Sequence, residues 1–247
     1  MLTRQRKSLL LNRLTEEGRL IASDLAAELG LSQDTIRRDL RELAAEGLLL
    51  RVHGGALPAS PTHQPIDLRR SMQAEAKLRL GRTAAGLIQS GQLVIVDGGT
   101  THLALIAALP LDLRCTVVTH APAIAAALEA HQGIEIILIG GRLFRHSMVA
   151  CGPVAQAGFQ RLRADLCFLG VTGVQAETGL TTGDAEEAAL KATMMQAAAE
   201  VVVLATADKL GATSPWQIAP LAGLATLVTP GARPDWLLAG VMHLAAV

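Results

Sequence analysis

The stretch Ser32-Gln-Asp-Thr-Ile-Arg-Arg-Asp-Leu-Arg-Glu-Leu43 decides how the first part of this chain folds. Its apolar residues Ile36, Leu40 and Leu43 recur at helical spacing and predict one buried face. Ser32, just before the apolar series, is a favourable N-cap. The opposite face of the predicted helix carries Gln33, Thr35, Arg37, Arg38 and Arg41.

The polar face of this helix has the chemistry that reads the major groove of DNA. Arginine forks match guanine O6 and N7, and the Gln33 amide matches adenine N6 and N7. Ser32 and Thr35 lie near the helix N-terminus, where hydroxyls and backbone amides can bind phosphate. The alternative is a solvated amphipathic helix whose charged face only meets water.

The residues before this helix predict a helix-turn-helix. A first helix is expected over residues 3–17, and a second is expected to begin after the N-cap Ser23. Gly30 ends the second helix, so only Gly30, Leu31 and the cap Ser32 separate it from the third. Such a short connection is what a helix-turn-helix needs.

The residues after the helix predict a wing. Residues 48–53 form a β-capable run that ends in Gly54-Gly55, which indicates a hairpin, and residues 19–21 can pair with it. Arg51 and His53 on this wing are expected to contact the DNA backbone or minor groove. The alternative for His53 is an ordinary residue at the end of a strand.

A proline-rich segment divides the chain. Pro58-Ala-Ser-Pro-Thr-His-Gln-Pro65 contains three prolines, which remove backbone donors and disfavour helix. We therefore expect a winged helix-turn-helix domain over residues 1–57, a linker over 58–73 and an α/β domain over 74–247.

The second part has the pattern of a parallel α/β sheet. Short apolar runs alternate with polar or glycine-rich turns and helical stretches. The runs cover residues 93–96, 115–118, 134–139, 166–169 and 201–205. Helices are expected over Gln73–Gln89, with Lys77 on its polar side, and from near Pro234. The turns after the strands are expected to meet where ligands bind in such sheets, at the carboxyl ends of the strands.

The turn Asp97-Gly-Gly-Thr-Thr101 is the best candidate for binding a small anion. Its glycines let the backbone come close to a ligand, and its hydroxyls and amides can bind phosphate. It lacks the lysine of a P-loop and the spacing of a dinucleotide fold, so no nucleotide cofactor is expected. A tight turn is the alternative. Lys191 and Lys209 can add positive charge or be exposed to solvent, and Glu187 with Lys191 can be only a helix-stabilising pair.

Composition sets limits on the class of protein. The chain has 22 Lys+Arg and 22 Asp+Glu, and residues 1–55 alone hold nine Lys/Arg against eight Asp/Glu, so DNA binding must rest on placement rather than net charge. It has no run of about 18 apolar residues and no signal-peptide pattern, so a soluble cytoplasmic protein is expected. Three cysteines without CxxC spacing favour buried thiols and no metal site. With 2% aromatic residues and no tyrosine, a ligand is expected to be held by hydrogen bonds rather than by stacking.

The stretch Ser32–Leu43, followed by Gly47, Leu48 and Arg51-Val-His-Gly-Gly-Ala56, resembles the DNA-binding domain of the DeoR/GlpR family of bacterial transcription regulators. The second part resembles that family's sensor domain in Asp97–Thr101, Gly140-Gly141, Gly152-Pro153, Asp165–Gly170, Gly173, Gly179-Leu-Thr181, Asp184, Glu187, Lys191 and Asp208-Lys209. The resemblance implies a fold similar to ribose-5-phosphate isomerase and an effector that is a phosphorylated sugar or polyol.

The resemblance also implies which residues bind the effector. Phosphate is expected at Asp97, Gly98, Gly99, Thr100 and Thr101. Sugar contacts are expected near His120, Gly140, Gly141, Arg142, Gly170, Gly173, Glu187, Lys191 and Lys209. Two residues depart from the family pattern: Gly99 stands where Ser or Thr is usual, and His120 stands where Asn is usual.

Three functional hypotheses remain at this point. The main one is a repressor of a sugar or polyol operon that binds operator DNA as a homo-oligomer, dimer or tetramer, under effector control. The second is a sugar-phosphate isomerase with an added DNA-binding domain, although residues 170–174 hold no carboxylate and Glu187 would be the lone base. The third is a DNA-bending protein, which would leave the convergent loops unexplained.

Overall fold

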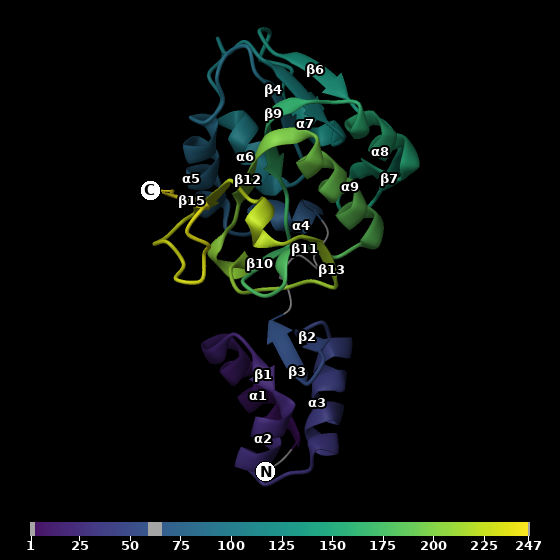
Figure 1. Cartoon of the computed structure of the whole chain (residues 1–247), viewed down its shortest axis with the longest axis vertical. Coiled ribbons are helices and arrows are strands. Elements are labelled where there is room, and N and C mark those ends of the chain that lie inside the picture. The colour runs from purple at the N-terminus through teal and green to yellow at the C-terminus, as the bar shows by residue number, and fades with distance from the viewer. Residues whose placement is uncertain (1–2, 59–65, 247) are drawn as a thin grey trace.

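Two separate hydrophobic cores divide the chain into two domains (Figure 1). The computed structural model describes residues 3–58 and 66–246. The first core draws on residues 10–56 and the second on residues 80–246. No helix in these described ranges is long and apolar enough to cross a membrane.

The N-terminal domain is a three-helix unit with a small antiparallel sheet. Its elements are α1 (Thr3–Glu17), β1 (Leu20–Ile21), α2 (Ala22–Leu29), α3 (Gln33–Ala45), β2 (Leu49–Val52) and β3 (Gly55–Pro58). The predicted third helix is confirmed, because Ser32 caps α3 by accepting a hydrogen bond from the Thr35 amide at 3.2 Å. Ile36, Leu40 and Leu43 are all buried, as their spacing predicts.

The wing is confirmed as a hairpin of β2 and β3, and β1 pairs antiparallel with β3. The chains approach so closely here that a Cβ on Gly55 would lie 1.7 Å from the Leu20 carbonyl oxygen. Only glycine fits this position. The same pairing corrects the expected start of the second helix. Because the Ala22 amide donates to the Gly54 carbonyl at 2.8 Å, α2 begins at Ala22 with Ile21 as N-cap, and not after Ser23.

A buried ion pair joins α1 to α3. The Arg6 guanidinium donates to both carboxylate oxygens of Asp39, and both side chains are almost fully buried. This pair fixes the position of α3 against the domain, because separating it would leave a buried charge uncompensated.

The C-terminal domain is built on a seven-stranded sheet in which every neighbouring pair is parallel, with order β15-β14-β12-β9-β4-β5-β6. These strands are β4 (Leu93–Val96), β5 (Thr116–Thr119), β6 (Glu135–Leu138), β9 (Ala164–Leu169), β12 (Ala198–Leu204), β14 (Thr226–Thr229) and β15 (Met242–Ala245). Two smaller antiparallel sheets flank it, formed by β7 (Arg142–Phe144) with β8 (Val149–Cys151), and by β10 (Gly173–Gln175), β11 (Gly179–Thr182) and β13 (Trp216–Ala219). The predicted parallel α/β architecture is confirmed.

The helices of this domain precede the first parallel strand or lie between later strands. They are α4 (Ile66–Ser71), α5 (Ala74–Ala85), α6 (Thr100–Ala107), α7 (Pro122–Ala127), α8 (Pro153–Gln160) and α9 (Ala185–Gln196), with 3-10 turns at Ala207–Lys209 and Leu221–Gly223. The helix expected over Gln73–Gln89 is shorter, since it ends at the cap Gly86. The stretch expected as a linker contains α4.

The end of the chain differs from expectation. The expected helix near Pro234 is wrong, and β14 and β15 extend the sheet instead. Arg233 donates to the carbonyls of Leu237, Leu238 and Val241, and so holds this segment in an irregular turn.

Candidate functional site

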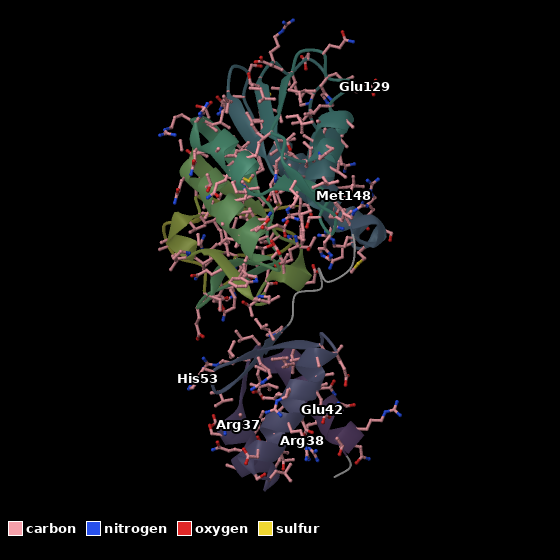
Figure 2. All side chains as sticks on the ribbon, turned by 90° about the vertical axis from the view of Figure 1, so that its right-hand side faces the viewer. Arg37, Arg38, Glu42, His53, Glu129 and Met148 are labelled. Carbon is pink, nitrogen blue, oxygen red and sulfur yellow. The ribbon has the colours of Figure 1, made fainter. Side chains whose placement is uncertain are left out.

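The polar face of α3 is open to solvent. Gln33, Arg37, Arg38 and Arg41 are all exposed, and Figure 2 shows Arg37 and Arg38 along the helix. Arg37 Nη2 donates to Gln33 Oε1 at 3.2 Å. Arg38 and Arg41 make no hydrogen bond or ion pair with any residue that the structure describes, so their guanidinium groups are available to a partner.

The other predicted DNA contacts lie next to this face. Ser32 Oγ and Thr35 Oγ1 share a hydrogen bond of 2.9 Å within the cap of α3. Arg51 and His53 are exposed on the wing formed by β2 and β3. The structure therefore brings the predicted residues to two elements of the same domain.

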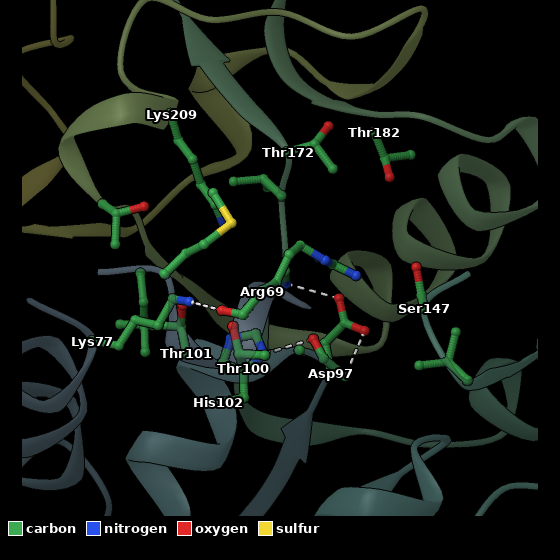
Figure 3. A pocket seen from close by; sticks show the side chains of 18 of the residues that line it. Arg69, Lys77, Asp97, Thr100, Thr101, His102, Ser147, Thr172, Thr182 and Lys209 are labelled. Atoms are coloured by element: carbon green, nitrogen blue, oxygen red, sulfur yellow. Dashed lines mark hydrogen bonds between the residues drawn. The ribbon is translucent and has the colours of Figure 1, made fainter. Parts of the chain in front are cut away.

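A pocket lies at the carboxyl ends of β4, β9 and β12, where a parallel sheet is expected to bind its ligand (Figure 3). It encloses about 800 Å³ of space free of atoms, part of it open to solvent. We call it the cationic pocket after Arg69, Lys77, Lys191 and Lys209. The predicted ligand residues that line it are Asp97, Gly98, Gly99, Thr100, Thr101, Gly170, Glu187, Lys191 and Lys209.

Asp97 organises the floor of this pocket. Its carboxylate accepts hydrogen bonds from the Gly98 amide at 2.6 Å, the Gly170 amide at 2.7 Å and His120 Nε2 at 2.8 Å, and it pairs with Lys191. Burial alone would raise the pKa of Asp97, but Lys191 and then His120 hold this pKa well below its usual value. Because both oxygens accept hydrogen bonds and the side chain is fully buried, Asp97 holds together the loops that form the pocket.

Gly170 is part of the same arrangement. A Cβ at this position would lie 2.8 Å from Asp97 Oδ2, so any side chain would push the carboxylate out of its place. The loop after β9 therefore needs glycine to reach Asp97.

Three of the four cationic side chains in the pocket have few hydrogen-bond partners or counter-charges. Arg69 Nε and Nη2 are buried without a hydrogen-bond partner among residues 3–58 and 66–246, and burial lowers the pKa of Arg69. Among the described residues, Lys77 Nζ donates only to the Arg69 carbonyl, at 2.5 Å, and burial lowers the pKa of Lys77 too. Burial lowers the pKa of Lys209 to about 8, and Lys209 Nζ has no hydrogen bond to a described residue. Such a cluster favours an anion, which would compensate all three charges.

The pocket also offers acceptors. Burial lowers the pKa of His102 to about 4, so the ring is neutral at pH 7. Its Nδ1 lies 3.1 Å from the Gly98 carbonyl and donates to it, which leaves Nε2 as an acceptor without a partner. Asp208 Oδ1 is likewise buried and accepts no hydrogen bond from the part of the chain that the structure describes. A ligand that carries hydroxyl donors beside an anionic group suits this combination.

Five predicted ligand residues lie outside the pocket lining. His120 is buried behind Asp97, with its Nδ1 2.6 Å from the Ala150 carbonyl. Arg142 is exposed and pairs with Glu186. Gly140 and Gly141 directly precede Arg142, and Gly173 belongs to β10. None of these three glycines lines the pocket.

Several residues of the pocket wall were not assigned to ligand binding from the sequence. These are Arg69, Met72, Gln73, His102, Ser147, Val149, Val171, Thr172, Thr182, Leu204, Thr206 and Asp208, together with Lys77, which the sequence placed only on a polar helix face. Lys77 was therefore recognisable from its place on a polar helix face, whereas Arg69 lies within residues 58–73, which were expected to form a linker. The described residues include no group of three or more His, Cys, Asp or Glu that could hold a metal ion.

Comparison with protein families agrees with both domains. Residues 6–62 match the DeoR-like helix-turn-helix domain, and residues 72–230 match the DeoR C terminal sensor domain. A DNA-binding domain joined to a sensor domain defines a transcriptional regulator.

Curated relatives cover nearly the whole chain. The HTH-type transcriptional regulator GlpR of Haloferax volcanii is 36% identical over 94% of this chain and 91% of that protein. The HTH-type transcriptional repressor GlcR of Bacillus subtilis is 34% identical over 93% and 89%, and the glycerol-3-phosphate regulon repressor of Escherichia coli is 31% identical over 84% and 82%. The chain belongs to the DeoR family. Its relatives are named as regulators rather than enzymes, so the isomerase alternative is not favoured.

Solved structures give only partial likenesses. Ribose 5-phosphate isomerase A of Methanocaldococcus jannaschii matches with a TM-score of 0.41 at 17% identity, over 56% of this chain and 54% of that one. The translation initiation factor eIF-2B of Pyrococcus horikoshii matches with a TM-score of 0.45 at 15% identity, over 90% and 81%. Likenesses this weak assign no function.

Proposed function

We propose that the protein represses a sugar or polyol catabolic operon, and that a phosphorylated sugar or polyol in the cationic pocket controls its binding to operator DNA. The protein acts in the cytoplasm, where the operator lies. The regulons named for its relatives, among them the glycerol-3-phosphate regulon, support this class of target.

One observation carries the proposal for the effector. Arg69 has two buried nitrogens that no described residue pairs with, and it lies beside Lys77 and Lys209, whose pKa values are lowered by burial. Buried cations are unfavourable unless they are paired. A phosphate group supplies the missing negative charge and enough acceptor oxygens for all three side chains.

The DNA contacts rest on α3 and the wing. Arg38 and Arg41 are free to reach base edges or phosphates, while Ser32 and Thr35 lie at the helix N-terminus. Helix-turn-helix proteins read paired half-sites with two copies of this helix, so a homo-oligomer is part of the proposal.

The position of Arg69 offers a route from effector to DNA. Arg69 lies on α4, which follows the segment leading from the wing, and the ion pair of Arg19 with Glu177 at 3.2 Å contacts both domains. An effector that binds Arg69 therefore acts on the connection between the two domains. It changes operator affinity by the difference in its affinity for the two arrangements.

A ligand screen followed by a DNA-binding assay tests the proposal. Thermal shift is measured with sugar and polyol phosphates, the matching unphosphorylated compounds and inorganic phosphate. A true effector at 100 times its dissociation constant stabilises the protein by about 2.7 kcal/mol. It should also alter binding to promoter DNA upstream of the neighbouring genes. A complete lack of response to every phosphorylated compound would reject the effector assignment.

A further inference from the structure

The DNA-binding domain contacts the sensor domain through the base of its wing. The Thr213 amide donates to the carbonyl of Pro58, the last residue of β3, at 3.2 Å. Arg19, which directly precedes β1, pairs at 3.2 Å with Glu177 in the turn between β10 and β11. Figure 1 shows β10, β11 and β13 at the end of the sensor domain that faces β3. Because β1 pairs with β3, both contacts hold the same small sheet.

One apolar side chain at this base is buried although it points away from its own domain. Ala56 belongs to the N-terminal core, and neighbouring residues of a strand point to opposite faces, so Leu57 lies on the outer face of the hairpin. Leu57 is only 5% exposed, yet it belongs to neither hydrophobic core. Val52, on the same outer face at the hairpin tip, is 39% exposed. The base of the hairpin is therefore covered, and the Thr213 contact places the sensor domain there.

The segment that contacts the wing starts at the cationic pocket. We call residues 210–215 the coupling segment. Lys209, directly before it, lines the cationic pocket, and Ser214 and Pro215 at its other end line a second hollow that shares four residues with this pocket. Three residues separate Lys209 from Thr213. The pocket and the contact with the wing therefore lie on one short stretch of backbone.

The coupling segment is fastened to β10 and β11. The Ser214 amide donates to Thr181 Oγ1 on β11 at 3.0 Å. The segment also packs closely on β10, because a Cβ on Gly173 would lie 2.3 Å from the Ala212 carbonyl oxygen. Closely packed elements transmit a displacement rather than absorb it. Since the turn between β10 and β11 carries the ion pair with the DNA-binding domain, a shift of the segment affects both contacts with the wing together.

Lys209 makes the coupling segment respond to an anion. Its Nζ is desolvated and has no hydrogen bond to a described residue, so a bound anion attracts it strongly. Movement of Lys209 toward the anion shifts the backbone that leads into Thr213. The hydrogen bond from Thr213 to Pro58 is already 3.2 Å long, at the upper end of the usual range, so further separation breaks it.

We propose that the coupling segment links the cationic pocket to the DNA-binding domain: an anion bound at Lys209 shifts the equilibrium between a wing docked on Thr213 and Glu177 and a wing that is released. This inference rests on the proposed function and names the element through which the effector acts. Docked and released wings place α3 differently, so the effector changes operator affinity through this equilibrium. The coupling is reciprocal, and bound operator changes effector affinity by the same factor.

Reversal of one charge at the domain junction tests the inference on the full chain. The measured quantity is the coupling ratio, which is the operator dissociation constant with a saturating probe divided by the constant without it. The probes are glycerol 3-phosphate, a set of pentose, hexose and hexitol monophosphates, and inorganic phosphate, with promoter DNA from upstream of the neighbouring genes. Glu177→Lys sets two cations against each other at an exposed contact and should move the coupling ratio at least threefold toward one.

A second charge reversal and a distant one serve as controls. Adding Arg19→Glu to Glu177→Lys restores an ion pair and should return the coupling ratio to within twofold of the parent value. Glu129→Lys should keep the parent ratio, since Glu129 is exposed at the end of the sensor domain away from the DNA-binding domain (Figure 2). An unchanged ratio in Glu177→Lys, or one that the double variant does not restore, overturns the inference and leaves the proposed function standing. A parent ratio of one with every probe overturns both.

Hydrogen exchange of the Thr213 amide provides a test that needs neither DNA nor effector. Leu57→Ser removes the apolar contact at the base of the wing and, because Leu57 lies outside the core of its domain, should leave the fold intact. We expect the Thr213 amide to exchange at least tenfold faster in this variant. The control Val52→Ser changes an exposed residue of the same face and should alter that rate less than twofold. An unchanged Thr213 rate in folded Leu57→Ser overturns the inference, because Leu57 would then not hold the wing on the coupling segment.

Discussion

The two domains each gather positive charge for phosphate-bearing partners, but in opposite surroundings. On α3, Arg38 and Arg41 are exposed to water and pair with no residue that the structure describes. In the cationic pocket, Arg69 and Lys209 are desolvated enough to have lowered pKa values. The exposed cluster suits a long polyanion that is bound through many weak, salt-sensitive contacts. The buried cluster suits one small anion, since each buried charge gains much from a partner.

This contrast explains how a chain of zero net charge can bind two anionic partners. The surface arginines lie on one helix face, so local placement is enough. The pocket cations come from α4, α5, α9 and the loop after β12, and their shared position depends on the whole fold. Substitutions in the two clusters should therefore affect stability and binding differently.

The largest expected effect is a loss of stability when Asp97 is replaced. This carboxylate accepts hydrogen bonds from donors on four segments of the sensor domain. Asp97→Asn leaves Lys191 buried without its counter-charge and should lower the free energy of unfolding by about 3–5 kcal/mol. Chemical denaturation measures this. The control Asp112→Asn alters an exposed residue of the same domain and should change stability by less than about 0.5 kcal/mol. A stable Asp97→Asn protein would contradict the role assigned to this carboxylate.

The next effect concerns the effector. Lys209→Met removes a desolvated charge that meets the phosphate and should weaken effector binding by about 2–5 kcal/mol. Isothermal titration measures this loss, with the exposed Arg114→Met as control. Operator affinity without effector should remain unchanged. Equal effector affinity in Lys209→Met and the parent protein would place the phosphate elsewhere.

A smaller effect is expected at the DNA surface. Arg38→Ala should weaken operator binding by about 1–3 kcal/mol if it contacts a base, and fluorescence anisotropy with labelled promoter DNA measures the change. Arg82→Ala removes a similar exposed arginine from α5 and serves as control. Because Arg38 is solvent-exposed, stability should not change. Footprints identical to those of the parent protein would exclude α3 from the groove.

The smallest expected effect is a pH dependence of effector binding in the cationic pocket, which DNA binding by the arginines of α3 should not share. The pKa of Lys209 is about 8 before ligand binds, and a bound phosphate dianion should raise it. Binding above pH 8 therefore requires proton uptake, and affinity should fall by up to tenfold, or about 1.4 kcal/mol, per pH unit. Titrations between pH 7 and 9 measure this slope, which should disappear in Lys209→Met. Arginines remain protonated, so operator binding through α3 should not show it. A flat effector profile would mean that Lys209 does not contact the phosphate.

The sequence predicted best what depends on local pattern. The helix capped by Ser32 has a strong periodic signal, and α3 lies where this signal indicates. The start of α2 was predicted at the wrong residue because it depends on the pairing of β1 with β3, a contact between residues far apart in sequence. Strands β14 and β15 were not predicted, because they form by pairing at the edge of a sheet that is built from other segments of the chain.

The cationic pocket was predicted only in part, because some of its residues follow from local sequence pattern and others from contacts between distant segments. The loop at Asp97–Thr101 and Lys209 follow apolar strands, so parallel topology brings them together, as expected. The four hydrogen bonds of Asp97 could not be read from sequence, because their donors lie on separate elements. Arg69 lies close to a proline cluster that masked the start of α4.

Strand β13 has a consequence for the optical properties of the molecule. Its first residue, Trp216, is about half exposed and pairs with Thr182, a residue of the cationic pocket wall, directly after the pocket residues Ser214 and Pro215. The only other tryptophan, Trp236, packs against the sensor core, and there is no tyrosine. Near-ultraviolet emission therefore comes from two indoles, one of them beside the proposed effector site. The protein therefore carries a native fluorophore there, and Trp236 is the one other indole whose emission must be separated from it.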